Sequence, residues 1–80
     1  MTYIAITPEQ LGKILKAQRK ATGLTQKQAG LRVGLLPKTV SKLENDTSSS
    51  SIDSLFKLMG ALEVEMVLSE KSKTPTKNDW

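Results

Sequence analysis

The sequence predicts an all-α domain of four short helices, followed by one short β-strand at residues 64–70. Apolar residues recur at helical spacing through residues 8–62, and stretches with glycine or serine separate the periodic runs. After residue 63 the apolar residues recur at every second position, which is typical of a strand. A chain of 80 residues can bury one small core and is too short for a second.

Composition excludes several classes of protein. The chain contains no Cys and no His, which excludes a disulfide framework and sites built on thiolate or imidazole groups. It also lacks a Gly-rich phosphate loop and a metal-ligand cluster, so we expect no catalytic residue, no metal and no cofactor. No apolar run approaches the ~20 residues of a membrane span, and the N-terminus has no signal-peptide layout. We therefore expect a non-enzymatic cytoplasmic protein that does not interact with a membrane.

Positive charge is concentrated in the first half of the chain, which carries +4 overall. Residues 8–45 hold eight basic and two acidic side chains, whereas residues 46–70 hold one basic and five acidic side chains. This division favours one end that binds a polyanion and another end with a separate role. An ordinary solvated surface carries similar charges, so charge alone leaves both interpretations open.

The first helix is predicted from its N-terminal signals. Thr7 can act as N-cap, Pro8 suits the first helical position, and Gln10 stands at the third position of a capping box. Apolar residues then recur at helical spacing as far as Arg19. Gly23 ends this helix as the residue after its C-cap.

Two shorter helices follow, joined by a turn at Gly34. Thr25 caps the first of them, predicted at Gln26–Val33, and Gln28 has the spacing of a second capping box. Gly30 lies inside this helix, where glycine costs roughly 1 kcal/mol relative to alanine. We therefore expect the next helix to approach it closely.

The next helix is predicted from Pro37 to Asn45, behind Leu36, which is a poor N-cap residue. Val40 and Leu43 point inward and leave a polar outer face. That face holds Lys38, Thr39, Ser41, Lys42 and Asn45. Such side chains can donate hydrogen bonds to phosphates and to base edges. Two helices joined by a tight glycine turn form a helix-turn-helix, whose second helix can lie in a DNA major groove.

Residues 47–51 are polar and include four consecutive serines. We interpret them as a flexible connector, with phosphate binding by hydroxyl and amide groups as the alternative. Ser51 or the preceding serine caps a fourth helix. The predicted core stripe of this helix has the spacing i, i+3, i+4, i+7 and consists of Ile52, Leu55, Phe56, Met59 and Leu62.

Residues 64–70 place Val64, Met66 and Leu68 on one face of a strand. A single strand cannot satisfy its own backbone groups, and the only other candidate strand is residues 3–6. We therefore predict pairing with the same strand of a second copy, in a two-fold dimer to which Val67 also contributes. A frayed extension of the fourth helix is the alternative.

Residues 71–80 are polar and aperiodic, so we expect a disordered tail after a domain formed by residues 1–70. Trp80 ends this tail. It is either incidental or an anchor that docks in a pocket of a partner protein, as tryptophan commonly does at interfaces.

Residues 8–63 resemble the lambda-repressor-like, XRE-type helix-turn-helix family. The resemblance is carried by the Arg19 segment, by GLTQ at residues 23–26, by Val33-Gly34 and by VSKLEN at residues 40–45. The order and intervals of these segments make the match more specific than a single motif. The resemblance implies a four-helix fold that binds double-stranded DNA in a sequence-specific way.

The resemblance also implies roles for individual residues. Gln26 matches a glutamine that contacts a DNA phosphate and braces the recognition helix, and Arg19 and Glu44 match a partly buried salt bridge. Positions that face base edges are matched by Pro37, Lys38, Ser41 and Lys42. The other expected DNA contacts, including those to the DNA backbone, are Thr25, Lys27, Thr39 and Asn45.

Two departures from the family pattern affect these expectations. Ala29 and Gly30 are smaller than the usual family residues, which predicts loose packing of their helix. Leu36 and Pro37 replace polar residues at the tip of the recognition helix, and neither side chain can hydrogen-bond a base edge. Base reading is therefore expected to rest mainly on Lys38, Ser41 and Lys42.

Over almost its whole length the chain is similar to the HipB-like antitoxins of HipA-type kinase toxin–antitoxin systems. The similarity rests on a helical domain followed at once by a VEMVL strand, a short hydrophilic tail and a terminal Trp. It implies a homodimeric repressor that binds a pseudo-palindromic operator in the bacterial nucleoid and associates with a HipA-like Ser/Thr kinase toxin. The alternative is an adaptor that scaffolds a protein complex through its dimer and tail without reading DNA.

Overall fold

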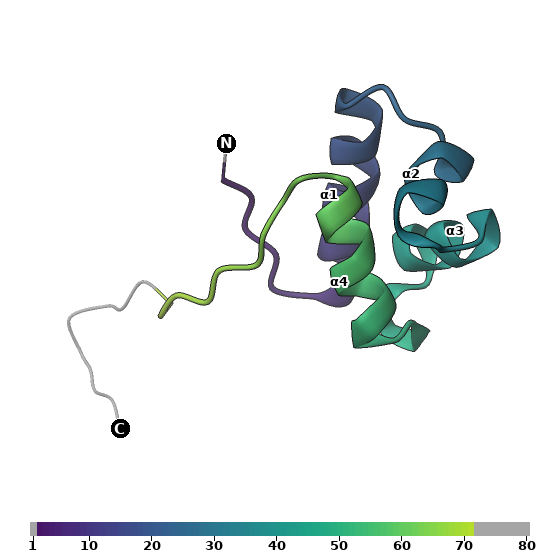
Figure 1. Ribbon diagram of the computed structural model, residues 1–80. Helices are drawn as coiled ribbons and strands as arrows, with labels where there is room; N and C mark the ends of the chain where they lie inside the picture. Colours follow the sequence, from purple (N-terminus) through teal and green to yellow (C-terminus); the bar gives the residue numbers. More distant parts are fainter. Residues whose placement is uncertain (1, 72–80) are drawn as a thin grey trace, which may run out of the picture.

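The computed structural model describes residues 2–71, in which four helices surround one apolar core (Figure 1). The elements are α1 (Pro8–Ala21), α2 (Gln26–Val33), α3 (Pro37–Asn45), the short 3-10 turn η1 (Thr47–Ser49) and α4 (Ile52–Ala61). The prediction of four helices is confirmed, and so are the predicted bounds of α2 and α3. Residues 72–80, which hold most of the predicted disordered tail and Trp80, lie outside the described residues.

Local capping signals account for where α1 and α2 begin. Thr7 and Thr25 each accept the backbone N–H of the residue three positions on, and the side chains of Gln10 and Gln28 accept the N–H of the cap residue in return. Both predicted capping boxes are therefore confirmed. Gly34 ends α2 with φ of 74°, a left-handed conformation that glycine adopts without a steric penalty.

Helix α3 lies at the centre of the domain, because it contacts each of the other three helices. Its inward residues Val40 and Leu43 are fully buried and join Leu15, Leu58 and Leu62 in the core. Burying one such aliphatic side chain stabilises a fold by about 1.5–3 kcal/mol. The core therefore holds α3 in a fixed position relative to the rest of the chain.

The buried face of α4 differs from the predicted stripe. Ile52 and Phe56 are 71% and 52% exposed, so their assignment to the core is wrong. Leu58, which the stripe omitted, is fully buried instead, beside the remaining members of the stripe. The helix is apolar on most of its circumference, and only its contacts with α2 and α3 decide which side is covered.

Helix α2 is tightly packed at its two small residues. Ala29 is fully buried. A Cβ on Gly30 would overlap the carbonyl oxygen of Leu35 in the turn and would lie 3.4 Å from Cγ2 of Val40 in α3. The expected close approach at Gly30 is confirmed, and the expected loose packing of α2 is wrong because no space for a larger side chain remains there.

The serine-rich connector forms hydrogen bonds within itself. The hydroxyl group of Ser49 donates to Oδ2 of Asp46 at 2.6 Å, and that of Ser50 donates to the carbonyl oxygen of Asp46 at 3.3 Å. Ser51 is the N-cap of α4 and accepts the N–H of Ser54 at 3.1 Å. These bonds and the neighbouring carboxylate favour a structural connector over a phosphate site, and part of the connector is the 3-10 turn η1.

Residues 64–71 leave the helical domain as a segment without helical structure. Helix α4 ends at Ala61, and Glu63 has φ of 59°, a left-handed conformation that interrupts the helical path. The alternative of a frayed extension of α4 is therefore wrong. No strand forms within residues 2–71, so pairing between two copies of the chain remains a prediction.

The four residues predicted for the dimer differ in their surroundings. Val64 packs against the core of its own chain, and its N–H donates to the carbonyl oxygen of Met59 at 3.0 Å. In contrast, Met66, Val67 and Leu68 are 43%, 72% and 89% exposed. Of the four, only Val67 and Leu68 have most of their surface exposed.

Candidate nucleic-acid interface

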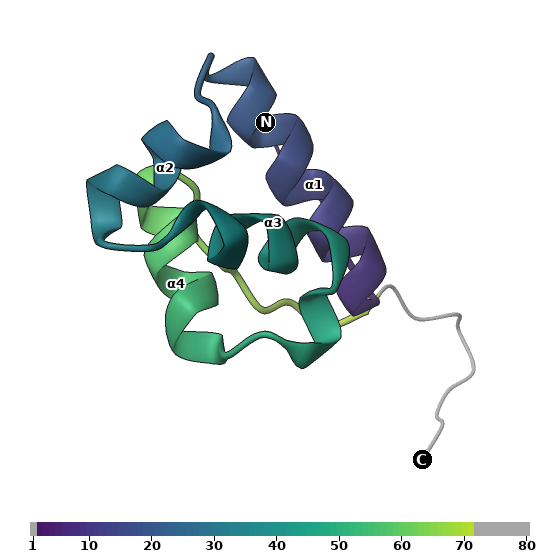
Figure 2. The same ribbon diagram turned by 90° about the vertical axis from the view of Figure 1, so that its right-hand side faces the viewer.

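The outer face of α3 brings together four of the residues that were predicted to contact DNA. They have the spacing i, i+3, i+4, i+7, which places them on one side of a helix, and they are Lys38, Ser41, Lys42 and Asn45. We call this strip the recognition face. Ser41 is partly buried, and the other three side chains are exposed. Figure 2 shows α3 at the front of the molecule, where a long ligand can reach it.

The opposite face of α3 is anchored in the protein interior. Val40 and Leu43 are fully buried, and Glu44 is only 5% exposed. Rotation of α3 would expose these residues, so the orientation of the recognition face is set by the core.

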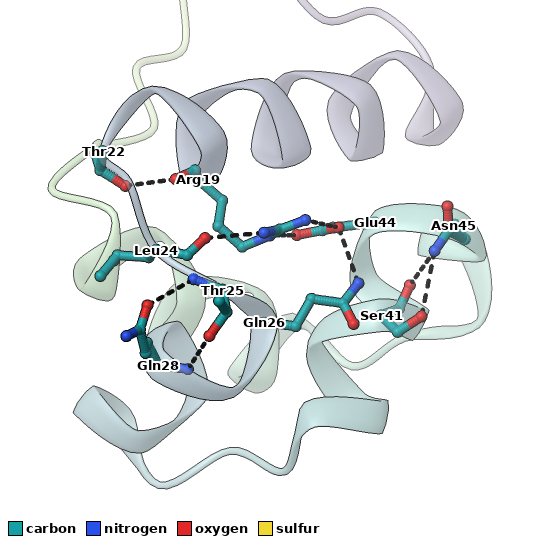
Figure 3. Close-up of polar contacts among 9 residues, drawn as sticks. All are labelled: Arg19, Thr22, Leu24, Thr25, Gln26, Gln28, Ser41, Glu44 and Asn45. Carbon is teal, nitrogen blue, oxygen red and sulfur yellow. Dashed lines mark hydrogen bonds and ion pairs between the residues drawn. The ribbon is translucent and has the colours of Figure 1, made fainter.

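An ion pair joins α3 to α1. Nε of Arg19 lies 2.6 Å from Oε2 of Glu44, and Nη2 of Arg19 donates to Oε1 of Glu44 at 3.2 Å. The remaining Nη1 donates to the carbonyl oxygen of Leu24 at 2.9 Å. This two-point contact holds both groups in a defined geometry (Figure 3). Arg19 and Glu44 thus form the structural salt bridge that the family resemblance implied, and both side chains are buried.

Gln26 connects the first turn of α2 to the same carboxylate. Its Nε2 donates to Oε1 of Glu44 at 3.2 Å, so Glu44 accepts hydrogen bonds from side chains of two other helices (Figure 3). Gln26 is partly exposed, which leaves its outward side accessible. This contact supplies the bracing of α3 that the resemblance implied, and the phosphate contact of Gln26 remains a prediction.

The N-terminal end of α2 has the features of an anion-binding position. Oγ1 of Thr25 accepts the N–H of Gln28 at 3.0 Å, so its hydroxyl hydrogen is left for an outside acceptor. Lys27 is exposed in the first turn. The first N–H groups of a helix and its dipole both attract anions. A DNA phosphate can therefore be held at this end of α2.

Ser41 and Asn45 interact with each other on the recognition face. Nδ2 of Asn45 donates to the carbonyl oxygen of Ser41 at 3.0 Å and to its Oγ at 3.3 Å (Figure 3). Because Oγ of Ser41 accepts this bond, its own hydrogen is left to point at an external acceptor. These bonds hold the amide group of Asn45 beside Ser41 on the recognition face.

The tip of α3 offers fewer polar groups than the rest of the recognition face. Pro37 is exposed at the first helical position, and Thr39 is partly buried. Leu36 is the N-cap without a side-chain hydrogen bond and is 64% exposed. Its apolar surface can contact only a group such as the methyl of thymine.

Two residues have structural roles that the sequence did not indicate. Nη1 of Arg32 donates to the carbonyl oxygen of Ala61 at 3.3 Å, so this basic side chain caps the end of α4. A Cβ on Gly12 would overlap the carbonyl oxygen of Glu44, so α1 can approach the end of α3 only at a glycine. Both partners are distant in sequence, and no local signal could have identified either contact.

Residues 2–71 contain no cluster of three or more potential metal-binding side chains. Within the same range no helix combines the length and the apolar character that a membrane span requires.

Known proteins share this fold and sequence pattern. Residues 15–68 match the helix-turn-helix family HTH_3. The chain is 31% identical over 70 residues to the antitoxin HipB of Escherichia coli O6:H1 (strain CFT073), covering 86% of this chain and 74% of that protein. A structure of a HipB variant in complex with an O2 20mer has a TM-score of 0.85 at 26% identity, covering 90% of this chain and 100% of that one. A HipA–HipB–O2–O3 complex has a TM-score of 0.84 at 27% identity, covering 89% of this chain and 100% of that one.

Proposed function

This chain belongs to the helix-turn-helix family HTH_3, and we propose that it is a HipB-like antitoxin that represses its own toxin–antitoxin operon by binding operator DNA. The observation that carries the proposal is the division of α3 into an exposed polar recognition face and a buried face anchored in the core. The similarity to HipB, which has been solved with an O2 20mer and with HipA, O2 and O3, supports the same function.

In this proposal the recognition face enters the major groove. Lys38 and Lys42 can donate to O6 and N7 of guanine or to nearby phosphates. Ser41 can donate its remaining hydrogen to an acceptor on a base edge. Leu36 and Pro37 at the tip contribute apolar contact, so the base preference at that end of the half-site is weak.

Phosphate contacts then fix the position of α3 in the groove. Thr25, Gln26 and Lys27 hold one phosphate at the N-terminal end of α2. Thr39 and Asn45 contact the backbone beside the recognition face. Gln26 also bonds to Glu44 in α3. A phosphate bound by Gln26 is therefore linked to α3 through the Gln26 side chain.

The proposed active form is a homodimer. Residues 64–68 of two copies pair, and the two recognition helices then read the halves of a pseudo-palindromic operator. Their half-sites are expected about 34–36 Å apart, or a multiple of that distance.

The proposed protein partner is a HipA-like Ser/Thr kinase toxin, by analogy with the HipA–HipB–O2–O3 complex. The tail and Trp80 are the predicted contact region for this kinase. We expect the chain itself to have no enzymatic activity, because it contains neither Cys nor His and its proposed role is binding. A DNA-binding repressor of this kind acts in the cytoplasm, at the nucleoid.

A binding titration tests the DNA-reading part of the proposal. The full chain is added to a labelled duplex from the DNA upstream of its own reading frame and, separately, to a shuffled duplex of the same composition. We expect binding to the first duplex to be tighter by about 10³-fold or more, as in specific repressors. The logarithm of the affinity should also fall linearly with the logarithm of the salt concentration, by about 0.9 for each phosphate neutralised. Equal affinity for the two duplexes would contradict the proposal.

The alternative is an adaptor that scaffolds a protein complex without reading DNA, and the exposed apolar tip at Leu36 favours it. Replacing Lys38 and Lys42 by glutamate separates the two functions. A repressor loses operator binding and transcriptional repression, whereas an adaptor keeps its partner and its cellular effect. Replacing Lys57 by glutamate on α4 is a control for the change of charge at an exposed lysine outside the recognition face.

A further inference from the structure

The N-terminal segment, residues 3–6, is attached to α1 at both of its ends. Oη of Tyr3 donates to Oε1 of Gln18 at 3.1 Å, and the N–H of Ile6 donates to Oε1 of Gln10 at 2.6 Å. Gln10 and Gln18 lie eight positions apart on the helix, a little over two turns, which places them roughly 80° apart around its axis. The segment therefore runs back along α1 toward its N-cap.

The lengths of helix and segment match. Eight helical residues span about 12 Å, and the three steps from Tyr3 to Ile6 span about 10 Å when extended, to which the tyrosine side chain adds its own reach. The two hydrogen bonds thus hold the segment extended and in a defined register.

An extended segment in this register turns one apolar face outward. Side chains alternate between two sides of an extended chain, so Ile4 and Ile6 share a side. They are 79% and 67% exposed, whereas Tyr3 is less exposed, at 39%. Two large aliphatic side chains are therefore presented to solvent from a backbone that is fixed in place.

Gln18 also connects this segment to the start of the C-terminal segment. Its Nε2 donates to the carbonyl oxygen of Leu62 at 3.4 Å, just after the end of α4. Figure 1 shows the N-terminal segment in purple and the C-terminal segment in yellow-green, both on the side of the molecule away from α2 and α3. The exposed side chains of Met66, Val67 and Leu68 lie on the second of these segments.

We propose that residues 3–6 are part of the dimer interface, and that the side formed by Ile4 and Ile6 packs against the second copy next to residues 64–68. This inference rests on the homodimer of the proposed function and specifies a surface that the homodimer uses. The occupant is a second copy because a two-fold axis that joins the 64–68 segments also brings the two N-terminal segments near that axis. In each chain Gln18 bonds both to Tyr3 and to Leu62, two residues before the 64–68 segment begins.

The size of the interface supports the same occupant. A two-stranded ribbon is marginally stable by itself, and three or more strands with an apolar face are needed for stable pairing. Stable interfaces bury about 800 Å² on each partner, with roughly 20–30 residues per side. Residues 64–68 alone are far smaller than this, and residues 3–6 add exposed apolar surface to the same interface.

The test compares two variants of the full chain in which exposed aliphatic residues are replaced by lysine. In the first variant Ile4 and Ile6 are both replaced by lysine, and in the control Ile52, which is 71% exposed on α4, is replaced by lysine. Sedimentation equilibrium measures the dimer dissociation constant of each, and circular dichroism checks that each variant is folded. We expect the double variant to dissociate about tenfold more readily or worse and the control to stay within about twofold of the unmodified chain.

A disulfide cross-link gives a second, direct measurement. The chain has no cysteine, so copies with Ile4→Cys and differently tagged copies with Val67→Cys can be mixed and oxidised without background. We expect a cross-link between the two tags, because the inference places these positions close together across the interface.

Two results would overturn the inference while leaving the proposed dimer intact. One is a double lysine variant that dimerises as tightly as the control. The other is a variant that dimerises normally but loses a kinase partner, which would assign this surface to the partner. If the unmodified chain itself is monomeric at all concentrations, the homodimer of the proposed function fails, and the inference fails with it.

Discussion

The two faces of α3 differ in what surrounds their polar groups. On the inner face the only charged group, Glu44, is buried and satisfied by Arg19 and Gln26. On the outer face Lys38 and Lys42 are exposed, and no salt bridge involves either of them within residues 2–71. Removing one partner of a buried charged pair destabilises the fold, whereas an exposed unpaired charge is available for a polyanion. Substitutions should therefore separate into those that change stability and those that change binding.

Replacing Glu44 by alanine has the largest expected effect. It leaves the Arg19 guanidinium buried without its carboxylate, which should lower the free energy of unfolding by about 3–5 kcal/mol. Chemical denaturation followed by circular dichroism measures this loss, with Lys42→Ala as the control from the outer face. A loss below about 1 kcal/mol would show that the pair is worth no more than a surface ion pair.

Replacing Lys38 and Lys42 together by alanine should produce the opposite pattern. We expect operator binding to weaken by about 1–3 kcal/mol for each base contact removed and the salt dependence to become shallower by about one unit for each phosphate contact removed. The free energy of unfolding should change by less than about 0.5 kcal/mol, because both side chains are exposed. Titrations at several salt concentrations, paired with denaturation curves, test whether the two faces are separable. Equal losses in binding and in stability would show that they are not.

Gln26 lies between the two faces, and its replacement by alanine should affect both measurements moderately. The variant loses one hydrogen bond to a buried carboxylate, so we expect about 1 kcal/mol less stability and a similar loss of operator affinity. Combined with Glu44→Ala, its effect on stability should largely disappear, because its partner is already gone. Strictly additive losses would mean that Gln26 acts independently of Glu44.

Replacing Lys57 by alanine has the smallest expected effect. Nζ of Lys57 lies 3.2 Å from Oδ2 of Asp53 one helical turn away, and both side chains are largely exposed. Such pairs contribute about 0.5 kcal/mol or less, so stability should hardly change. The variant removes the same charge as Lys42→Ala. If operator affinity fell as much in Lys57→Ala as in Lys42→Ala, net charge and not the recognition face would control binding.

The helix boundaries could be predicted from the sequence because their signals are local. The capping boxes of α1 and α2 lie within four consecutive residues each, and Pro37 marks the first position of α3. The polar side of α3 was also predictable, since period and polarity together define it. The roles of its residues toward DNA remain predictions.

Features that depend on contacts between distant segments could not be predicted. The sequence pattern of α4 allowed Phe56 to be buried, and only the positions of α2 and α3 leave it exposed. Arg32 was counted with the basic surface, yet it caps α4 across the domain. Gly30 was expected to permit a close approach, but the same residue was expected to loosen α2. The second expectation is wrong, because the carbonyl oxygen of Leu35 in the turn fills the space beside Gly30.

The hydrogen bond between Gln26 and Glu44 has a consequence for heat resistance. Gln26 is the proposed phosphate contact and also bonds to Glu44 of the structural pair, so operator binding uses the folded arrangement of α1, α2 and α3. Any ligand that binds only the folded state stabilises it, by about 2.7 kcal/mol when the free ligand is at a hundred times its dissociation constant. The operator then acts as a reversible thermal stabiliser of its repressor. The melting temperature of this chain, measured as DNA is added, should rise with operator occupancy and so report binding without any label.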